Sequence, residues 1–191
     1  MAVTVVSGVP GVGSSRVTEA ARKRLDDDYR VMNFGDLMLE ESVARGSASS
    51  RDDLSELPPR EQITLQRRAA EEIRDVAHGG DRDVIVDTHF VLNTGTGYLP
   101  GLPLPVLREV GAARFVLIEA SPATIEERRS EHESVRDYYD THEAAIEFHQ
   151  QMNRMAAVAY ASYASAPFHR IANEGTVDEA AEELAAIVEG R

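Results

Sequence analysis

The chain has 191 residues, 42% of them hydrophobic, and this size and composition suit one globular domain with a buried core. Its formal net charge of −13 argues against nucleic acid as a partner, because binding to a phosphate backbone needs a basic surface. There is no cysteine, which excludes disulfides and thiolate metal sites, and no apolar run long enough to span a membrane. The N-terminus lacks the pattern of a signal peptide, so we expect a cytoplasmic protein.

The charged residues are unusually distributed. Among the basic residues only Lys23 is a lysine, and acidic residues outnumber basic ones by 33 to 20. An acidic surface with almost no lysine is typical of proteins from salt-loving organisms. A GC-rich genome, which favours arginine, alanine, aspartate and valine, is the alternative explanation.

Short apolar runs rich in β-branched residues alternate along the chain with helical patterns. Such runs suit strands that are buried on both faces, and their alternation with helices predicts a parallel sheet covered on both sides. The predicted strands are residues 3–6, 29–34, 84–87, 115–119 and 169–173. The predicted helices are residues 17–25, 36–45, 58–78, 122–129, 148–163 and 177–188.

Three segments between these elements show no clear period. Residues 46–59 form a polar connector, and residues 88–103, with several glycines and prolines, form a long loop. Residues 130–143 are charged and show no core face. In the long helix that follows, an apolar stripe marks the expected inner face, with Met152 and Met155 as core filler. The stripe consists of Phe148, Met152, Met155, Ala159 and Tyr163.

The segment GVPGVGSS at residues 8–15 follows the first strand and opens the first helix. It has the spacing of a phosphate-binding loop, G-x-x-x-x-G-K-[ST], except that Ser14 stands where lysine is usual. Glycines let backbone N–H groups turn toward phosphate oxygens, and the helix N-terminus adds a favourable dipole. The alternative is a tight turn without a ligand. The candidate phosphate-binding residues are Gly8, Val9, Pro10, Gly11, Val12, Gly13, Ser14, Ser15 and Arg16.

Asp87 ends the apolar run VIVD, where a phosphate-loop protein places the carboxylate that holds Mg²⁺ directly or through water. Ser15 can offer its hydroxyl to the same ion. The alternative role for Asp87 is to cap the next turn. His89 follows closely, at the end of a strand where open α/β sheets bind ligands.

Phosphoryl transfer depends mainly on positioning and charge stabilisation, so arginines near the loop are candidates for both. Taken alone, each of them would more often be a surface arginine. Arg136, in the charged segment, would suit a lid that closes over phosphates. The candidates are Arg16, Arg51, Arg128, Arg129, Arg136 and Arg154.

Several motifs in order along nearly the whole chain resemble archaeal-type adenylate kinases, which are phosphate-loop nucleoside monophosphate kinases. Some members of that family have serine in place of the loop lysine. The most specific motif is GYLPGLP after VDTH. The full set is GVPGVGSS (8–15), NFGDLM (33–38), RDDL (51–54), VDTH (86–89), GYLPGLP (97–103), ERR (127–129), VRD (135–137) and QQMNR (150–154).

The resemblance implies Mg²⁺-dependent, reversible transfer of a phosphoryl group from ATP to AMP, giving two ADP, with no permanently bound cofactor. It implies a three-layer α/β domain over residues 1–191, with strand order 2-3-1-4-5. It also implies an acceptor-binding insertion at about 35–79, a lid at about 129–143, and a homotrimer.

The resemblance also assigns residues. The loop at 8–15 would hold the ATP phosphates and Asp87 would organise magnesium. Arg128, Arg136 and Arg154 would surround the transferred group. The AMP side would comprise Gly35, Asp36, Arg51, Thr88 and His89. The ATP adenine would lie along Asn173, Glu174, Gly175 and Thr176.

Two positions depart from the family pattern. Ser55 and Ser134 stand where family members often have arginine, which affects the acceptor side and the lid. Two other functions remain open at this point. One is a kinase of the same fold for CMP, UMP or a small alcohol, and the other is a nucleotide-binding switch or assembly factor that hydrolyses ATP slowly.

Overall fold

The structure, a computed structural model, describes residues 1–26, 28–80, 82–131 and 140–190, with the backbone alone for residues 52 and 55. Its centre is a five-stranded parallel sheet in the order β2-β3-β1-β6-β7. The strands are β1 (Val3–Ser7), β2 (Tyr29–Asn33), β3 (Asp83–Thr88), β6 (Arg114–Glu119) and β7 (Phe168–Ala172). Numbered within this sheet alone, the order is 2-3-1-4-5. The labels differ from the expected ones because β4 and β5 lie outside the sheet.

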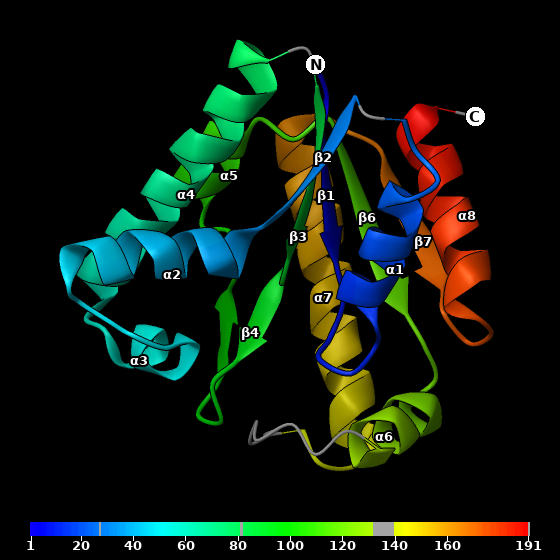
Figure 1. The fold of residues 1–191 in the computed structure, drawn as a ribbon. Helices are drawn as coiled ribbons and strands as arrows, with labels where there is room; N and C mark the ends of the chain where they lie inside the picture. Colours follow the sequence, from blue (N-terminus) through cyan, green and yellow to red (C-terminus); the bar gives the residue numbers. More distant parts are fainter. Residues whose placement is uncertain (27, 81, 132–139, 191) are drawn as a thin grey trace.

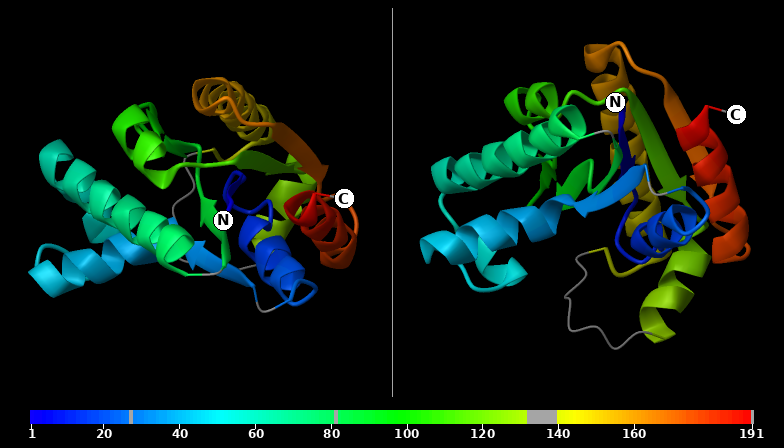
Figure 2. Two further views of the ribbon diagram at one scale, coloured as in Figure 1. Left: turned by 90° about the horizontal axis from the view of Figure 1, so that it is seen from above. Right: turned by 45° about the horizontal axis from the view of Figure 1, so that its top comes forward.

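Helices cover both faces of the sheet, which makes three layers (Figures 1 and 2). On one face α1 (Ser14–Arg22) packs beside α8 (Val177–Glu189), and on the other lie α4 (Pro59–Gly79), α5 (Leu104–Val110) and α7 (Glu143–Ala164). The side chains of each strand alternate between these layers: Val5 of β1 joins the core under α4, α5 and α7, and Val6 joins the core under α1 and α8. The expected fold class is confirmed.

The carboxyl end of the sheet is surrounded by the shorter elements. In Figure 1 the loop after β1 lies at the lower end of the central strands, close to α6 (Pro122–Glu131). Helices α2 (Phe34–Arg45) and α3 (Arg51–Glu56) lead away from the end of β2. No helix in the described part of the chain is long and apolar enough to cross a membrane.

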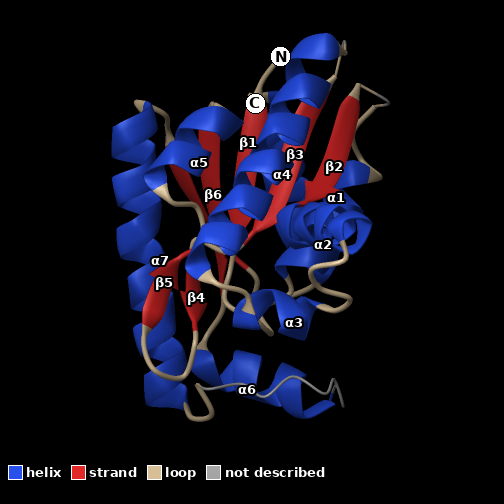
Figure 3. Cartoon of the chain, turned by 90° about the vertical axis from the view of Figure 1, so that its left-hand side faces the viewer, coloured by secondary structure: helices blue, strands red, loops and turns tan. Residues whose placement is uncertain are grey.

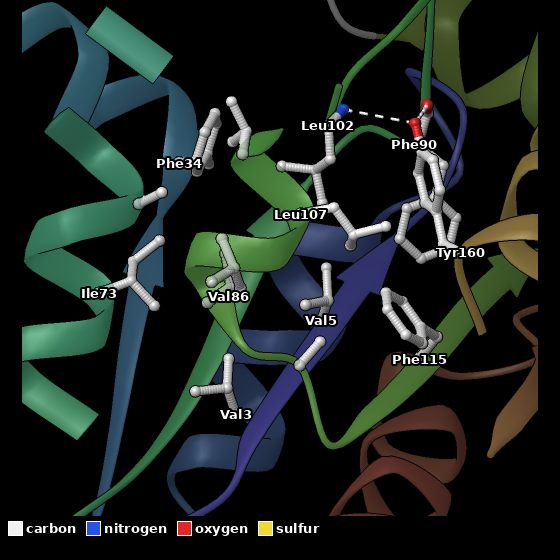
Figure 4. Close-up of a cluster of buried hydrophobic side chains, with 14 of the residues drawn as sticks. Val3, Val5, Phe34, Ile73, Val86, Phe90, Leu102, Leu107, Phe115 and Tyr160 are labelled. Carbon is white, nitrogen blue, oxygen red and sulfur yellow. Dashed lines mark hydrogen bonds between the residues drawn. The ribbon is translucent and has the colours of Figure 1, made fainter. Parts of the chain in front are cut away.

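The prediction of one long loop over residues 88–103 is wrong. The segment forms an antiparallel hairpin of β4 (Val91–Asn93) and β5 (Tyr98–Pro100), whose two strands lie side by side in Figure 3. Each strand has three residues, too few to show a period of two in the sequence. The base of the hairpin is held by Tyr160 of α7, whose hydroxyl donates to the Phe90 carbonyl at 3.1 Å and accepts from Leu102 N at 3.4 Å (Figure 4).

The polar connector at 46–59 also contains regular structure. Helix α3 begins after Ser50, whose hydroxyl accepts from Asp53 N while the Asp53 carboxylate accepts from Ser50 N. Helix α5 was not predicted either. It begins after Pro103 with Pro105 in its first turn, and it is only seven residues long.

The predicted inner face of α7 is wrong for most of its stripe. Met152 packs partly buried against the core, as expected, but the other four residues of the stripe are exposed. Phe148 is 48% exposed, Met155 65% and Tyr163 49%, so Met155 is not core filler. The inner face instead carries buried polar side chains at His149, Gln150 and Asn153, together with Ile146, Ala157, Tyr160 and Ala161. Hydrophobicity alone could not identify this face, because its polar groups are buried with hydrogen-bond partners.

Candidate nucleotide site

The loop between β1 and α1 has the backbone conformation that its glycines permit. Gly11 and Gly13 both have φ of +90°, a region that side-chain-bearing residues rarely adopt. A Cβ on Gly11 would lie 2.7 Å from Cγ of Arg129, so the absence of a side chain also lets Arg129 pack against the loop. Ser14 and Ser15 begin α1, and Ser14 is buried. The loop therefore places a helix N-terminus at the carboxyl end of the central strand.

Two arginines and an asparagine hold the carbonyl side of this loop. Arg128 Nη1 donates to the Val12 carbonyl at 3.2 Å, and Asn173 Nδ2 donates to the same oxygen at 2.8 Å. Arg129 Nε donates to the Pro10 carbonyl at 2.9 Å. Two of the arginines predicted near the loop, Arg128 and Arg129, therefore contact its backbone carbonyls.

Arg129 is anchored by Asp140. Its Nη1 donates to the Asp140 carbonyl at 2.7 Å and its Nη2 lies 3.2 Å from the carboxylate. Burial alone would raise the pKa of Asp140, but the hydrogen bond from His149 and the charge of Arg129 outweigh it, and the pKa is lowered. The expectation that residues 130–143 have no core face is thus wrong at Asp140, which is buried.

A second cluster joins the phosphate loop to the end of β3. Ser15 Oγ donates to Asp87 Oδ2 at 2.6 Å, and Asn33 Nδ2 donates to the same oxygen at 3.1 Å. Burial raises the pKa of Asp87, and these hydrogen bonds oppose the rise without cancelling it. A hydroxyl oxygen beside a carboxylate oxygen is a donor set that suits Mg²⁺, which prefers oxygen ligands.

Asn33 continues this cluster toward α3. Its Oδ1 accepts from Arg51 Nη2 at 2.9 Å and from Asp36 N at 3.1 Å, so it also caps α2. The Arg51 guanidinium reaches the Asp36 carboxylate as well, and Gly35 lies directly beneath it. Three residues expected on the acceptor side, Gly35, Asp36 and Arg51, therefore lie together, next to Asp87.

Thr88 and His89 follow Asp87 at the carboxyl end of β3. His89 Nδ1 lies 2.9 Å from the carbonyl oxygen of Gly8, the first residue of the phosphate loop. Phe90 N, one residue further, donates to the buried hydroxyl of Ser7 at 2.8 Å. These contacts hold the segment between β3 and β4 against the end of β1 and the start of the phosphate loop.

Arg154 is paired with two carboxylates in this structure. Its Nε donates to the buried Glu119 carboxylate at 2.5 Å and its Nη1 donates to Glu147 at 2.8 Å. Arg170 donates to the other Glu119 oxygen at 2.5 Å. Two carboxylates thus compensate Arg154 in this structure, whereas Arg128 contacts the loop itself.

Hydrogen bonds to α6, α8 and the phosphate loop hold the segment after β7 in place. The side-chain oxygen of Glu174 accepts from Thr124 Oγ1 at 3.0 Å, and Thr176 caps α8 in a capping box with Glu179. A Cβ on Gly175 would lie 2.4 Å from the Glu179 carboxylate. Asn173 is buried and tied to Val12, so the predicted adenine segment begins at the phosphate loop.

Some expectations fall outside the described residues. Arg136 and Ser134 lie in the undescribed range 132–139, and the side chain of Ser55 is not described. Of the predicted lid, only residues 129–131 and 140–143 are described. Sequence reasoning missed Asn33, Asp140 and His149. The only available signal was the helix-capping position of Asn33, because the other two depend on contacts between distant segments.

Comparison with known proteins shows which family the chain resembles. The AAA domain family matches residues 7–147. The adenylate kinase of Methanothermobacter thermautotrophicus is 41% identical over 191 residues, covering 99% of this chain and 100% of the relative. That of Methanopyrus kandleri is 44% identical over 185 residues, covering 95% of each.

Solved structures support the fold alone. A tunicamycin resistance protein from Deinococcus radiodurans superposes with a TM-score of 0.63 at 13% identity, over 98% of this chain and 95% of that one. A gluconokinase from Sinorhizobium meliloti superposes with a TM-score of 0.58 at 15% identity, over 99% and 92% of the two chains.

Proposed function

The chain belongs to the adenylate kinase family found in archaea, and we propose from this membership that it transfers a phosphoryl group from ATP to AMP, giving two ADP, in the cytoplasm. The observation that carries the proposal is identity of 41% to an adenylate kinase over 99% of the chain. That span includes both the phosphate loop and the separate cluster around Arg51, which a protein that only binds or hydrolyses ATP would not need.

On this proposal ATP binds along the carboxyl end of the sheet. The backbone of residues 8–15 would surround its phosphates, with Arg16 at the first turn of α1. Residues 173–176 would lie along its adenine, and the hydrogen bond from Asn173 to Val12 supports a continuous surface between the two. AMP would occupy the side of Gly35, Asp36, Arg51, Thr88 and His89, within an insertion at about 35–79.

Magnesium is the cofactor that this reaction requires. Ser15 and Asp87 would hold it, the carboxylate directly or through water, and their contact at 2.6 Å supports a shared oxygen site. When bound, the ion neutralises charge on the phosphate oxygens. Asn33 would keep Asp87 oriented in either case, because its amide donates to the carboxylate.

The charge that a loop lysine would supply is assigned to Arg128. Its guanidinium donates to the Val12 carbonyl, so it lies against the phosphate loop itself. An arginine fork can bind phosphate oxygens two at a time. A role for Arg136, within a lid at about 129–143, stays a prediction. A role for Arg154 beside the transferred phosphoryl group also stays a prediction.

The family resemblance implies a homo-oligomer, specifically a trimer, and we propose that its interface lies on the outer face of α7. Exposed apolar side chains on this helix meet those of the hairpin, where the ring of Tyr98 lies 5.5 Å from that of Phe148. A second copy of the chain is the partner proposed for this α7–hairpin surface. Its residues are Leu92, Leu99, Phe148, Met155, Val158 and Tyr163.

The test of the function is a comparison of acceptors. ADP formation from MgATP is measured with AMP, CMP, UMP or no acceptor, at low and at molar KCl. We expect fast turnover with AMP and little with the other three. Turnover that favours CMP or UMP would mean a kinase for another nucleotide, and equal turnover with and without AMP would leave a nucleotide-hydrolysing switch.

A further inference from the structure

A chain of buried polar contacts runs from the phosphate loop to the β4–β5 hairpin. It begins at the Pro10 carbonyl, which accepts from Arg129, and passes through Asp140, which accepts from Arg129 and from His149. It ends where His149 Nε2 lies 3.1 Å from the carbonyl oxygen of Val91, the first residue of β4. The side chains of Arg129, Asp140 and His149 are 8%, 3% and 2% exposed.

Both ring nitrogens of His149 face acceptors. Nδ1 lies 3.1 Å from Asp140 Oδ2, and the Val91 carbonyl can only accept. The ring of Tyr98 packs 5.3 Å away and closes this site from the hairpin side. His149 therefore links Asp140 to the hairpin, with one partner at each ring nitrogen.

The contact at the other end of the chain bears directly on the loop. Arg129 packs against Gly11, whose φ of +90° helps turn the loop backbone. Without a lysine at position 14, the backbone N–H groups of the loop supply a larger share of the contacts to phosphate, so their orientation matters more. A contact that fixes the Pro10 carbonyl therefore also fixes the N–H groups that follow it.

We propose that His149 and Asp140 are positioning residues for ATP: they hold Arg129 against the Pro10 carbonyl and so keep the phosphate loop in its binding conformation. This inference rests on the proposed function, because it assigns the loop to ATP. Neither residue needs to touch a nucleotide. The contact from His149 to Asp140 acts on the phosphate loop through Arg129. The contact from His149 to Val91 fixes the position of the imidazole ring.

Two substitutions of His149 remove these two contacts one at a time. His149→Asn keeps a donor near the position of Nδ1 and loses the one toward Val91, whereas His149→Gln keeps a donor near Nε2 and loses the one toward Asp140. Dissociation constants for MgATP and for AMP are measured separately by calorimetry. We expect His149→Gln to weaken MgATP binding about tenfold, since one charge-assisted hydrogen bond is lost. AMP binding should change less than about twofold, and His149→Asn should stay near the wild type for both ligands.

Tyr160→Phe is the matched control. It deletes the buried hydroxyl by which the same helix holds Phe90 and Leu102 at the hairpin, without contacting Arg129. It should change MgATP affinity less than His149→Gln does. If His149→Gln does not fold, as judged by circular dichroism, Asp140→Asn replaces it with the same expectation.

Three results would overturn the inference: equal loss of MgATP and AMP affinity, equal behaviour of the Asn and Gln variants, or a loss in Tyr160→Phe as large as in His149→Gln. The proposed function is tested apart from this by the wild type. Wild-type protein that binds MgATP but shows no AMP-dependent turnover would refute the kinase and leave the positioning test intact.

Discussion

At the level of single residues, the proposed function assigns the charge of the missing loop lysine to Arg128, while Ser14 occupies the position of that lysine. Ser14 is buried at the start of α1, and the Arg128 guanidinium donates to the Val12 carbonyl. Loss of the Ser14 hydroxyl removes at most one neutral hydrogen bond, about 1 kcal/mol. On the proposed assignment, loss of Arg128 would remove a full charge near the reacting phosphates, which is worth about a hundredfold in rate.

Ser14→Ala should therefore lower kcat by well under about tenfold, and Arg128→Ala by about a hundredfold or more. Steady-state kinetics with MgATP and AMP measure both. Arg128→Lys, which keeps a charge but not the planar fork, should fall between them. If Ser14→Ala abolishes activity while Arg128→Ala does not, the assignment of the missing charge to Arg128 is wrong.

The individual site residues differ in how far the sequence could predict them. The loop glycines are a local signal, because a strand end and a helix start lie within a few positions of each other, and Asp87 is one because it ends an apolar run. The contact between Arg129, Asp140 and Pro10 joins segments far apart in the chain. No spacing rule brings such residues together, so Asp140 and His149 could be found only from the folded chain.

Among the elements, the β4–β5 hairpin depends on one glycine. A Cβ on Gly101 would lie 1.7 Å from the carbonyl oxygen of His89, a backbone atom that cannot move aside alone. Gly101→Ala should lower the free energy of unfolding by about 3 kcal/mol. Gly97→Ala, in the same hairpin with open space around it, should change it by less than about 0.5 kcal/mol. Urea denaturation compares the two, and equal stabilities would mean that the hairpin base is not tightly packed.

Helix α7 shows why patterns of hydrophobicity can mislead. Apolar residues recur on both of its faces, and the buried face contains His149, Gln150 and Asn153. The parallel sheet, in contrast, was predictable, because β-branched runs alternating with helices admit few other arrangements. Its strand order came from the family resemblance and not from the pattern.

The outer face of α7 leads to a prediction about assembly. Met155 is 65% exposed in the single chain, so Met155→Glu should leave the stability of the isolated chain nearly unchanged. In an oligomer built on the α7–hairpin surface, the new charge would be buried against a partner and would reduce the mass measured by light scattering. Val43→Glu, a similarly exposed apolar position on α2, is the control. A mass unchanged by Met155→Glu would place the interface elsewhere.

For the whole molecule, the net charge of −13 leads to a prediction about how stability depends on salt. Like charges repel at low ionic strength, and at about 1 M salt the Debye length falls to roughly 3 Å, which screens that repulsion. We expect the melting temperature to rise strongly between low and molar KCl. NaCl at matched ionic strength should act similarly if screening is the cause. A melting temperature that stays constant would leave genome composition as the explanation for the scarcity of lysine.

We propose that the carboxyl end of the sheet binds two nucleotides and that a phosphoryl group passes between them. The most direct test is the stoichiometry of products, measured by chromatography together with an assay for inorganic phosphate. With MgATP and AMP, we expect two ADP for each ATP consumed and no phosphate released. One ADP and one phosphate for each ATP, with AMP unchanged, would contradict the claim.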